Sequence, residues 1–147
     1  MRQKQSLPSD EAVSAWANLM RVSQALLDRV ESDLKAAGMP PLAWYDVLLE
    51  LDRAEPSGIR AFELQKQILV AQYNLSRLVD RIEAAGYAER LPCSSDGRCQ
   101  VLRITAKGRA VLQKMRPVYR DTVRKHFASK LAKSETGQLL RSLEKLA

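Results

Sequence analysis

The chain has 147 residues, with 24 Lys and Arg against 17 Asp and Glu, so its formal net charge is +7. Hydrophobic residues make up 46% of it and charged residues 28%, which is typical of a globular domain and excludes disordered and fibrous chains. The apolar runs are far shorter than the roughly 20 residues of a membrane helix, and Met1 to Gln5 lead into no apolar signal segment, so we expect a cytoplasmic protein of one domain.

The first predicted element is a long amphipathic helix that begins after Ser9 and ends at Gly38. Ser9 is a favourable N-cap, and Gly38 suits the position after a helix end. Apolar residues recur between them at helical spacing, at Val13, Trp16, Met20, Leu27, Val30 and Leu34. About 28 residues give a rod of roughly 40 Å. Because so small a domain cannot cover such a helix alone, we expect part of it to be an interface.

Three shorter helices are predicted next. The second helix has Pro41 in its first turn and ends at Glu55–Gly58. A brief third helix is expected to bury Phe62, Leu64 and Ile68. The fourth is predicted from Ala71 to Ala85, and its apolar residues recur at i, i+3, i+4 and i+7, at Leu75, Leu78, Val79 and Ile82. Its opposite face is polar.

A hairpin and two more helices complete the chain. Tyr87–Leu91 and Cys99–Ile104 are typical of short strands, and the Asp96-Gly97 step between them favours a tight turn. Thr105 is expected to cap a long fifth helix, which Pro117 should kink. Ser134 is expected to cap a sixth helix that carries Leu139, Leu140, Leu143 and Leu146.

Positive charge is concentrated towards the end of the sequence. Residues 1–55 have a net charge of −3, residues 56–108 of +3, and residues 109–147 of +7. Such a gradient favours long-range attraction to a polyanion and contacts with its phosphates. The alternative interpretation is a solvated basic face.

Two short helices, a turn and a hairpin, in this order, are the elements of a winged helix-turn-helix. The second of the two helices enters the major groove of DNA, where side chains that donate and accept hydrogen bonds read base edges. The expected fold is therefore mainly α, with a small antiparallel β-hairpin wing. One alternative is that the polar face of the fourth helix is merely solvated. Another is that the winged helix is a protein-interaction module. Such a module would need apolar anchors on this surface, and only Tyr73 qualifies as one.

Several blocks of the sequence resemble the MarR family of bacterial transcription regulators. They are Leu75–Gly86, Glu89-Arg90, Asp96–Arg98, Ile104–Gly108 and, in the second helix, Trp44–Leu51. The resemblance implies one domain over residues 1–147, with a DNA-binding lobe at about 38–108 and dimerisation helices at 9–37 and 109–147. It also implies a homodimer that binds a pseudo-palindromic operator in double-stranded DNA, more often as a repressor than as an activator, and is released by a small aromatic or phenolic effector.

The resemblance also assigns site residues by position. The residues that it places towards the groove and the DNA backbone are Gln72, Tyr73, Asn74, Ser76, Arg77 and Arg81. Arg98 is expected to reach the adjacent minor groove from the wing, with Asp96 orienting it. Two positions depart from the family pattern: Ala71 stands where a Ser often opens the recognition helix, and Gly137 stands where an acidic residue would complete a capping box after Ser134.

Two features are candidates for regulation. Trp16, Arg21, Trp44 and Tyr45 can line a ligand pocket, with Arg21 pairing a carboxylate, or they can be core aromatics and a surface arginine. Cys93 and Cys99 bracket the wing, and a folded hairpin can bring them within disulfide distance, so a redox-sensing regulator is an alternative function. In a reducing cytosol two free thiols are the default.

The sequence offers little for catalysis or metal binding. Cys93, Cys99 and His126 cannot supply the four ligands of a structural zinc site. The available pair of nucleophile and base is a cysteine with His126. These residues lie on different elements, and no glycine-rich oxyanion loop is near them. We therefore expect no enzyme activity, no metal and no cofactor.

Overall fold

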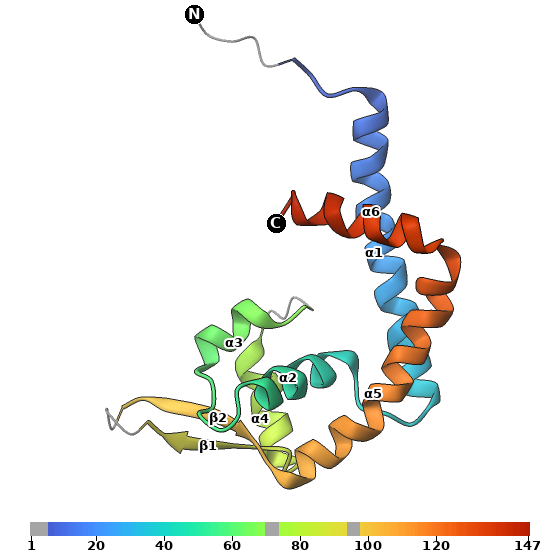
Figure 1. The fold of residues 1–147 in the computed structure, drawn as a ribbon. Helices are drawn as coiled ribbons and strands as arrows, with labels where there is room; N and C mark the ends of the chain where they lie inside the picture. Colours follow the sequence, from blue (N-terminus) through green and yellow to red (C-terminus); the bar gives the residue numbers. More distant parts are fainter. Residues whose placement is uncertain (1–5, 70–73, 94–97) are drawn as a thin grey trace, which may run out of the picture.

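The computed structural model describes residues 6–69, 74–93 and 98–147. Its elements are α1 (Asp10–Ala36), α2 (Leu42–Arg53), α3 (Ala61–Gln67), α4 (Leu75–Ala84), β1 (Ala88–Pro92), β2 (Gln100–Ile104), α5 (Ala106–His126), the short 3-10 helix η1 (Ala128–Lys130) and α6 (Lys133–Glu144). Helices α2, α3 and α4 form a lobe with the hairpin, whereas α1, α6 and the second half of α5 form an arm beside it (Figure 1). The predicted fold class is confirmed. Within the described ranges, no helix has the length and apolar character that crossing a membrane requires.

The predicted starts of the two longest helices are confirmed. The Ser9 hydroxyl accepts a hydrogen bond from the Ala12 amide at 3.1 Å, and the Thr105 hydroxyl accepts one from the Gly108 amide at 3.0 Å. These bonds satisfy amides that have no partner inside a helix. Gly38 has a φ of +72° and ends α1, as predicted, because this conformation suits glycine best.

The predicted starts of the fourth and sixth helices are wrong. Helix α4 begins at Leu75 rather than Ala71, because Asn74 has a non-helical backbone and its side chain accepts a hydrogen bond from the Arg77 amide at 3.1 Å. Helix α6 is not capped by Ser134. Instead, the Glu135 carboxylate accepts a hydrogen bond from the Ala132 amide at 2.8 Å. The acidic partner that seemed to be missing at Gly137 is therefore supplied by Glu135.

The core is centred on α2, which packs against α1, α3, α4, α5 and β2. Its most completely buried side chains are Leu34, Val47, Leu48, Leu51, Leu64, Ile82, Leu112 and Met115. All four apolar residues predicted on α4 are buried, and burying one such side chain contributes about 1.5–3 kcal/mol. The prediction for Phe62 is wrong, since this side chain is 55% exposed. A helix of seven residues turns only one narrow face towards the core, and on α3 the buried residue of that face is Leu64.

The wing is an antiparallel pair that runs from Ala88 opposite Ile104 to Pro92 opposite Gln100. The segment before α3 adds to it, because Ile59 and Leu102 exchange backbone hydrogen bonds of 3.0 and 2.8 Å. The first turn of α5 then passes so close to the chain before β1 that a Cβ on Gly108 would overlap the carbonyl oxygen of Tyr87. Glycine is therefore required at this crossing.

The arm is only partly covered within one chain. Val30 and Leu34, near the end of α1, are buried against α5, which curves upwards alongside α1 in Figure 1. There the Asp33 carboxylate accepts hydrogen bonds from Thr122 at 2.8 Å and from His126 at 2.7 Å, and these bonds, the Thr122 bond foremost, lower its pKa. In contrast, Trp16 is 65% exposed, and none of the α6 leucines is buried. The expected interface residues therefore remain uncovered.

Candidate nucleic-acid interface

Helix α4 exposes a polar face on the side away from the core. Asn74, Ser76, Arg77 and Arg81 are all exposed on it or at its start. Arg77 and Arg81 are four residues apart, so they are neighbours on the helix surface. Neither guanidinium forms an ion pair within residues 6–69, 74–93 and 98–147. The helix thus presents two adjacent cations to solvent.

Not all of the expected contact residues belong to the described part of the chain. Gln72, Tyr73 and Asp96 lie outside the described residues, as does Ala71. Asn74, predicted to lie on the helix surface, is instead the N-cap of α4. Its oxygen already accepts a hydrogen bond from the Arg77 amide, and its side-chain NH₂ group has two hydrogens that it can donate to a partner.

A charge network that the sequence did not indicate joins α4 to the wing. Arg90 on β1 contacts the carboxylates of Asp80 at 2.6 Å and Glu83 at 2.9 Å. The hydrogen bond to Asp80 is the largest factor that raises the pKa of Arg90. Because these side chains are partly exposed, the pairs contribute little to stability. Their effect is geometric, since they fix the wing relative to the exposed face of α4.

The tip of the wing is closed by a disulfide. Cys93 and Cys99 are bonded to each other, with their Cα atoms 5.2 Å apart, so the default of two free thiols is not what the structure shows. The Cys93 amide also donates a hydrogen bond to the Cys99 carbonyl at 2.9 Å. Arg98, next to Cys99, is exposed at this tip.

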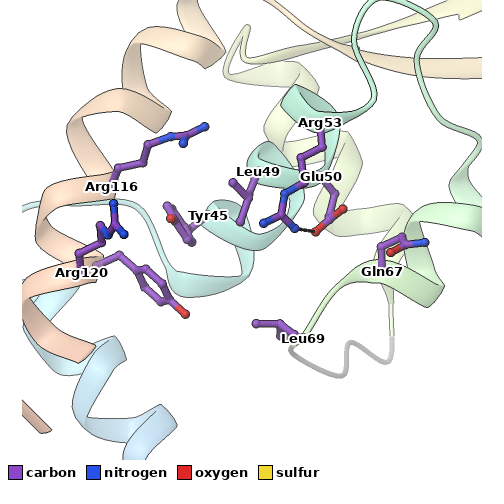
Figure 2. Close-up of a pocket in the computed structure, with 9 residues that line it drawn as sticks. Tyr45, Leu49, Glu50, Arg53, Gln67, Leu69, Arg116 and Arg120 are labelled. Atoms are coloured by element: carbon purple, nitrogen blue, oxygen red, sulfur yellow. Dashed lines mark hydrogen bonds and ion pairs between the residues drawn. The ribbon is translucent and has the colours of Figure 1, made fainter. Parts of the chain in front are cut away.

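A hollow of about 570 Å³ lies between the lobe and the arm (Figure 2). It is lined by Tyr45, Leu49, Glu50 and Arg53 of α2, by Gln67 and Leu69 at the end of α3, and by Arg116, Tyr119 and Arg120 of α5. Figure 2 shows Arg116 and Arg120 on one side of Tyr45, with Arg53 beyond Leu49 on the other. The hollow therefore combines aromatic surface with three guanidinium groups.

The charges in this hollow are unevenly compensated. Arg53 contacts Glu50 at 2.8 Å and Arg116 contacts Asp52 at 3.0 Å, whereas Arg120 has no ion pair within the described part of the chain. The rings of Tyr45 and Tyr119 stack with centroids 4.4 Å apart. Burial raises the pKa of Tyr45, and the positive charges of the three arginines oppose that rise. Such a site can bind an aromatic anion.

Of the four residues proposed to line a ligand pocket, the structure places only Tyr45 in this hollow. Trp44 packs edge-on against Tyr87, with ring centroids 5.9 Å apart. Trp16 and Arg21 are exposed on α1 and do not line the hollow. Sequence reasoning missed the residues of α5, although Arg116, Tyr119 and Arg120 follow the i, i+3, i+4 spacing of a shared helix face.

Comparisons with known proteins agree on one family. The model of the MarR family matches residues 37–98. The transcriptional repressor MprA of Escherichia coli K12 is 28% identical over 127 residues, which cover 86% of this chain and 71% of that protein. AbsC, a MarR family transcriptional regulator from Streptomyces coelicolor, superimposes with a TM-score of 0.83 at 26% identity, covering 97% of this chain and 95% of AbsC. Sco3205, from the same family and organism, was crystallised with DNA and gives a TM-score of 0.84 at 25% identity over 99% and 91% of the two chains.

Proposed function

Because the chain belongs to the MarR family of transcriptional regulators, we propose that it is a homodimeric repressor that binds a pseudo-palindromic operator. The observation that carries this proposal is the exposed face of α4, where Arg77 and Arg81 have no ion pair within the described residues. The structure of Sco3205 with DNA supports it, since that protein shares the fold and is a DNA-bound relative.

The proposed contacts follow from the position of each residue. Helix α4 enters the major groove, and Ser76 and Arg77, near its N-terminal end, read base edges. Arg81, one turn further along, contacts the phosphate backbone. Arg98 reaches the minor groove from the wing. The proposal also includes Asn74 and, outside the described residues, Gln72, Tyr73 and Asp96.

The proposed dimer uses the uncovered part of the arm. The apolar stripe of α1 is buried near Val30 and Leu34 but exposed near Val13 and Trp16, so a second copy is a suitable cover for the exposed half. The leucines of α6 add apolar surface, with Leu140, Leu143 and Leu146 exposed. A two-fold axis through this region presents two copies of α4 to successive half-sites, about 34 Å apart.

Selection of bound sequences from random duplex DNA tests the proposal. At near-physiological salt we expect an inverted repeat with half-sites about one helical turn apart. Arg77→Ala should weaken binding to that sequence at least about fivefold, because a bidentate contact contributes about 1–3 kcal/mol. Arg29→Ala, which removes an exposed charge from α1, is the matched control and should have little effect. Recovery of no motif, with only salt-sensitive background binding, would favour a protein-interaction module instead.

We propose that the effector is an aromatic carboxylate bound in the hollow between lobe and arm. Arg120 supplies a cation that is not already paired within the described residues, and Tyr45 and Tyr119 supply a stacked aromatic wall. Leu69 also lines the hollow, and it lies on the segment that leads to α4. A ligand here therefore contacts the arm and the approach to the DNA-binding helix at once.

Redox control of the wing is a second candidate, favoured by the Cys93–Cys99 bond. Pro92 has no amide hydrogen to donate to the ladder, so beyond it the described part of the tip is held by the disulfide and by the hydrogen bond from Cys93 to Cys99. Reduction would release a constraint beside Arg98. The bond would form again when a hydroperoxide accepts the two electrons of the thiols and is reduced to water or an alcohol.

Challenging the operator complex separates the two candidates. Salicylate is a suitable probe because it carries a carboxylate and a phenol, and we expect it to release the wild type. Arg120→Gln should require at least about 10 times more salicylate, since a charge-assisted contact is lost. In a parallel experiment, operator affinity is compared between reduced and peroxide-treated protein. A difference that Cys93→Ser removes would select redox control, and a response to neither challenge would contradict both candidates.

A further inference from the structure

Asp46 is a buried carboxylate in the middle of α2. Only 5% of its surface is exposed, and burying a charged group is unfavourable unless hydrogen bonds compensate for the lost hydration. Its Oδ2 atom accepts a hydrogen bond of 3.1 Å from the amide of Leu69, 23 residues later. This bond joins α2 to the segment that follows α3.

The bond lies just beyond the end of α3. Helix α3 ends at Gln67, and Ile68 already has an extended backbone. Leu69 is the next residue, so its amide points away from the helix ladder and is held by Asp46 instead. Helix α4 is fixed at its other end by Arg90, which contacts Asp80 and Glu83. Leu69 and the later turns of α4 are thus held by two separate polar contacts.

The same bond holds a residue that lines the hollow in Figure 2. The Leu69 side chain lines the hollow and is 77% exposed, and Tyr45, the neighbour of Asp46, lines it from α2. Burial raises the pKa of both Tyr45 and Tyr119, and the negative charge of Asp46 adds to each rise. The carboxylate therefore lies close to the aromatic wall as well as to Leu69.

We propose that Asp46 is a positioning residue for DNA binding. Its carboxylate fixes Leu69, just beyond the end of α3, and thereby the direction in which α4 presents Arg77 and Arg81. Leu69, held by that carboxylate, is also the residue through which a ligand in the hollow shifts α4. This inference rests on the proposed function for its DNA-binding consequence, while the local role of Asp46 can be measured without DNA.

The first test compares operator affinity with affinity for an unrelated duplex. Asp46→Ala is expected to weaken operator binding about 10-fold, because the Leu69 amide loses its buried acceptor, and to leave non-specific binding unchanged. Asp46→Asn keeps an acceptor oxygen and should retain affinity within about threefold. Asp28→Ala removes an exposed carboxylate from α1 that accepts a bond from Gln24, and this control should behave as the wild type. Equal operator affinity in Asp46→Ala and wild type would overturn the inference.

Hydrogen exchange supplies a second, DNA-independent test. In Asp46→Ala we expect faster exchange at Leu69 and in the first turn of α4, with α1 and α5 unchanged. Unchanged exchange at Leu69, or a uniform increase across the protein, would mean that Asp46 does not position the segment at Leu69. A wild type without sequence preference would overturn the proposed function, whereas the exchange pattern would still decide the role of Asp46.

Discussion

Replacing Gly108 with alanine is expected to destabilise the protein by roughly 3 kcal/mol, because overpacking of a close backbone contact cannot relax cheaply. Gly108 is buried in the first turn of α5. A Cβ at this position would overlap the carbonyl oxygen of Tyr87 and would lie 2.9 Å from Cγ1 of Ile104. A flexible side chain can swing aside, but a backbone carbonyl cannot. The substitution must therefore separate α5 from the start of the wing.

Thermal or urea unfolding measures this effect, with Gly137→Ala as the matched control. The nearest atom to a Cβ on Gly137 is the tip of the Arg141 side chain at 3.3 Å, which can move. This control should be neutral or should stabilise the protein by up to about 1 kcal/mol, through higher helix propensity. A Gly108→Ala variant that unfolds at the same midpoint as the wild type would show that α5 and Tyr87 can separate enough to admit a Cβ without cost.

Trp16→Asp is expected to convert the proposed dimer to monomers and to reduce operator affinity at least about 100-fold. The side chain is exposed in one chain, and an aromatic anchor at the centre of an interface commonly contributes 2 kcal/mol or more. A charge buried there has a further cost. Each monomer would then have one half-site contact instead of two, and the avidity of the pair would be lost.

Sedimentation and operator titration check this prediction together. Val22→Asp is the matched control, because Val22 is also exposed but lies about 120° around α1 from Trp16, at about 100° per residue. It should remain dimeric and bind normally. A Trp16→Asp variant that sediments as the wild type does would place the interface elsewhere.

The features that the sequence predicted correctly depend on neighbours within a few residues. The caps by Ser9 and Thr105 are bonds across three residues, and the buried stripe of α4 repeats within one helix. The start of α4 was placed too early because Asn74, a good cap, was interpreted as part of the helix. Phe62 was wrongly predicted to be buried, because the burial of a residue on α3 depends on the elements that pack against this helix and not on its own sequence.

The candidate site was harder to predict because its contacts join distant positions. Asp46 and Leu69 are 23 residues apart, Arg90 and Asp80 lie on different elements, and the hollow brings α2 against α5. No periodic pattern in the sequence predicts such pairs, because only tertiary packing brings the two residues together. The exposed arginines of α4 could be predicted, because the position opposite an apolar stripe follows from helix geometry.

The cap of α4 also has a consequence for base preference. An amide nitrogen has no lone pair available to accept, so the bond from the Arg77 amide fixes which end of the Asn74 side chain turns towards the helix. Asparagine recognises adenine by donating to N7 while accepting from N6. In the proposed complex, an Asn74 side chain whose oxygen is directed at the backbone of α4 would offer its NH₂ group to the groove, and such a donor complements the N7 and O6 acceptors of guanine or the O4 of thymine.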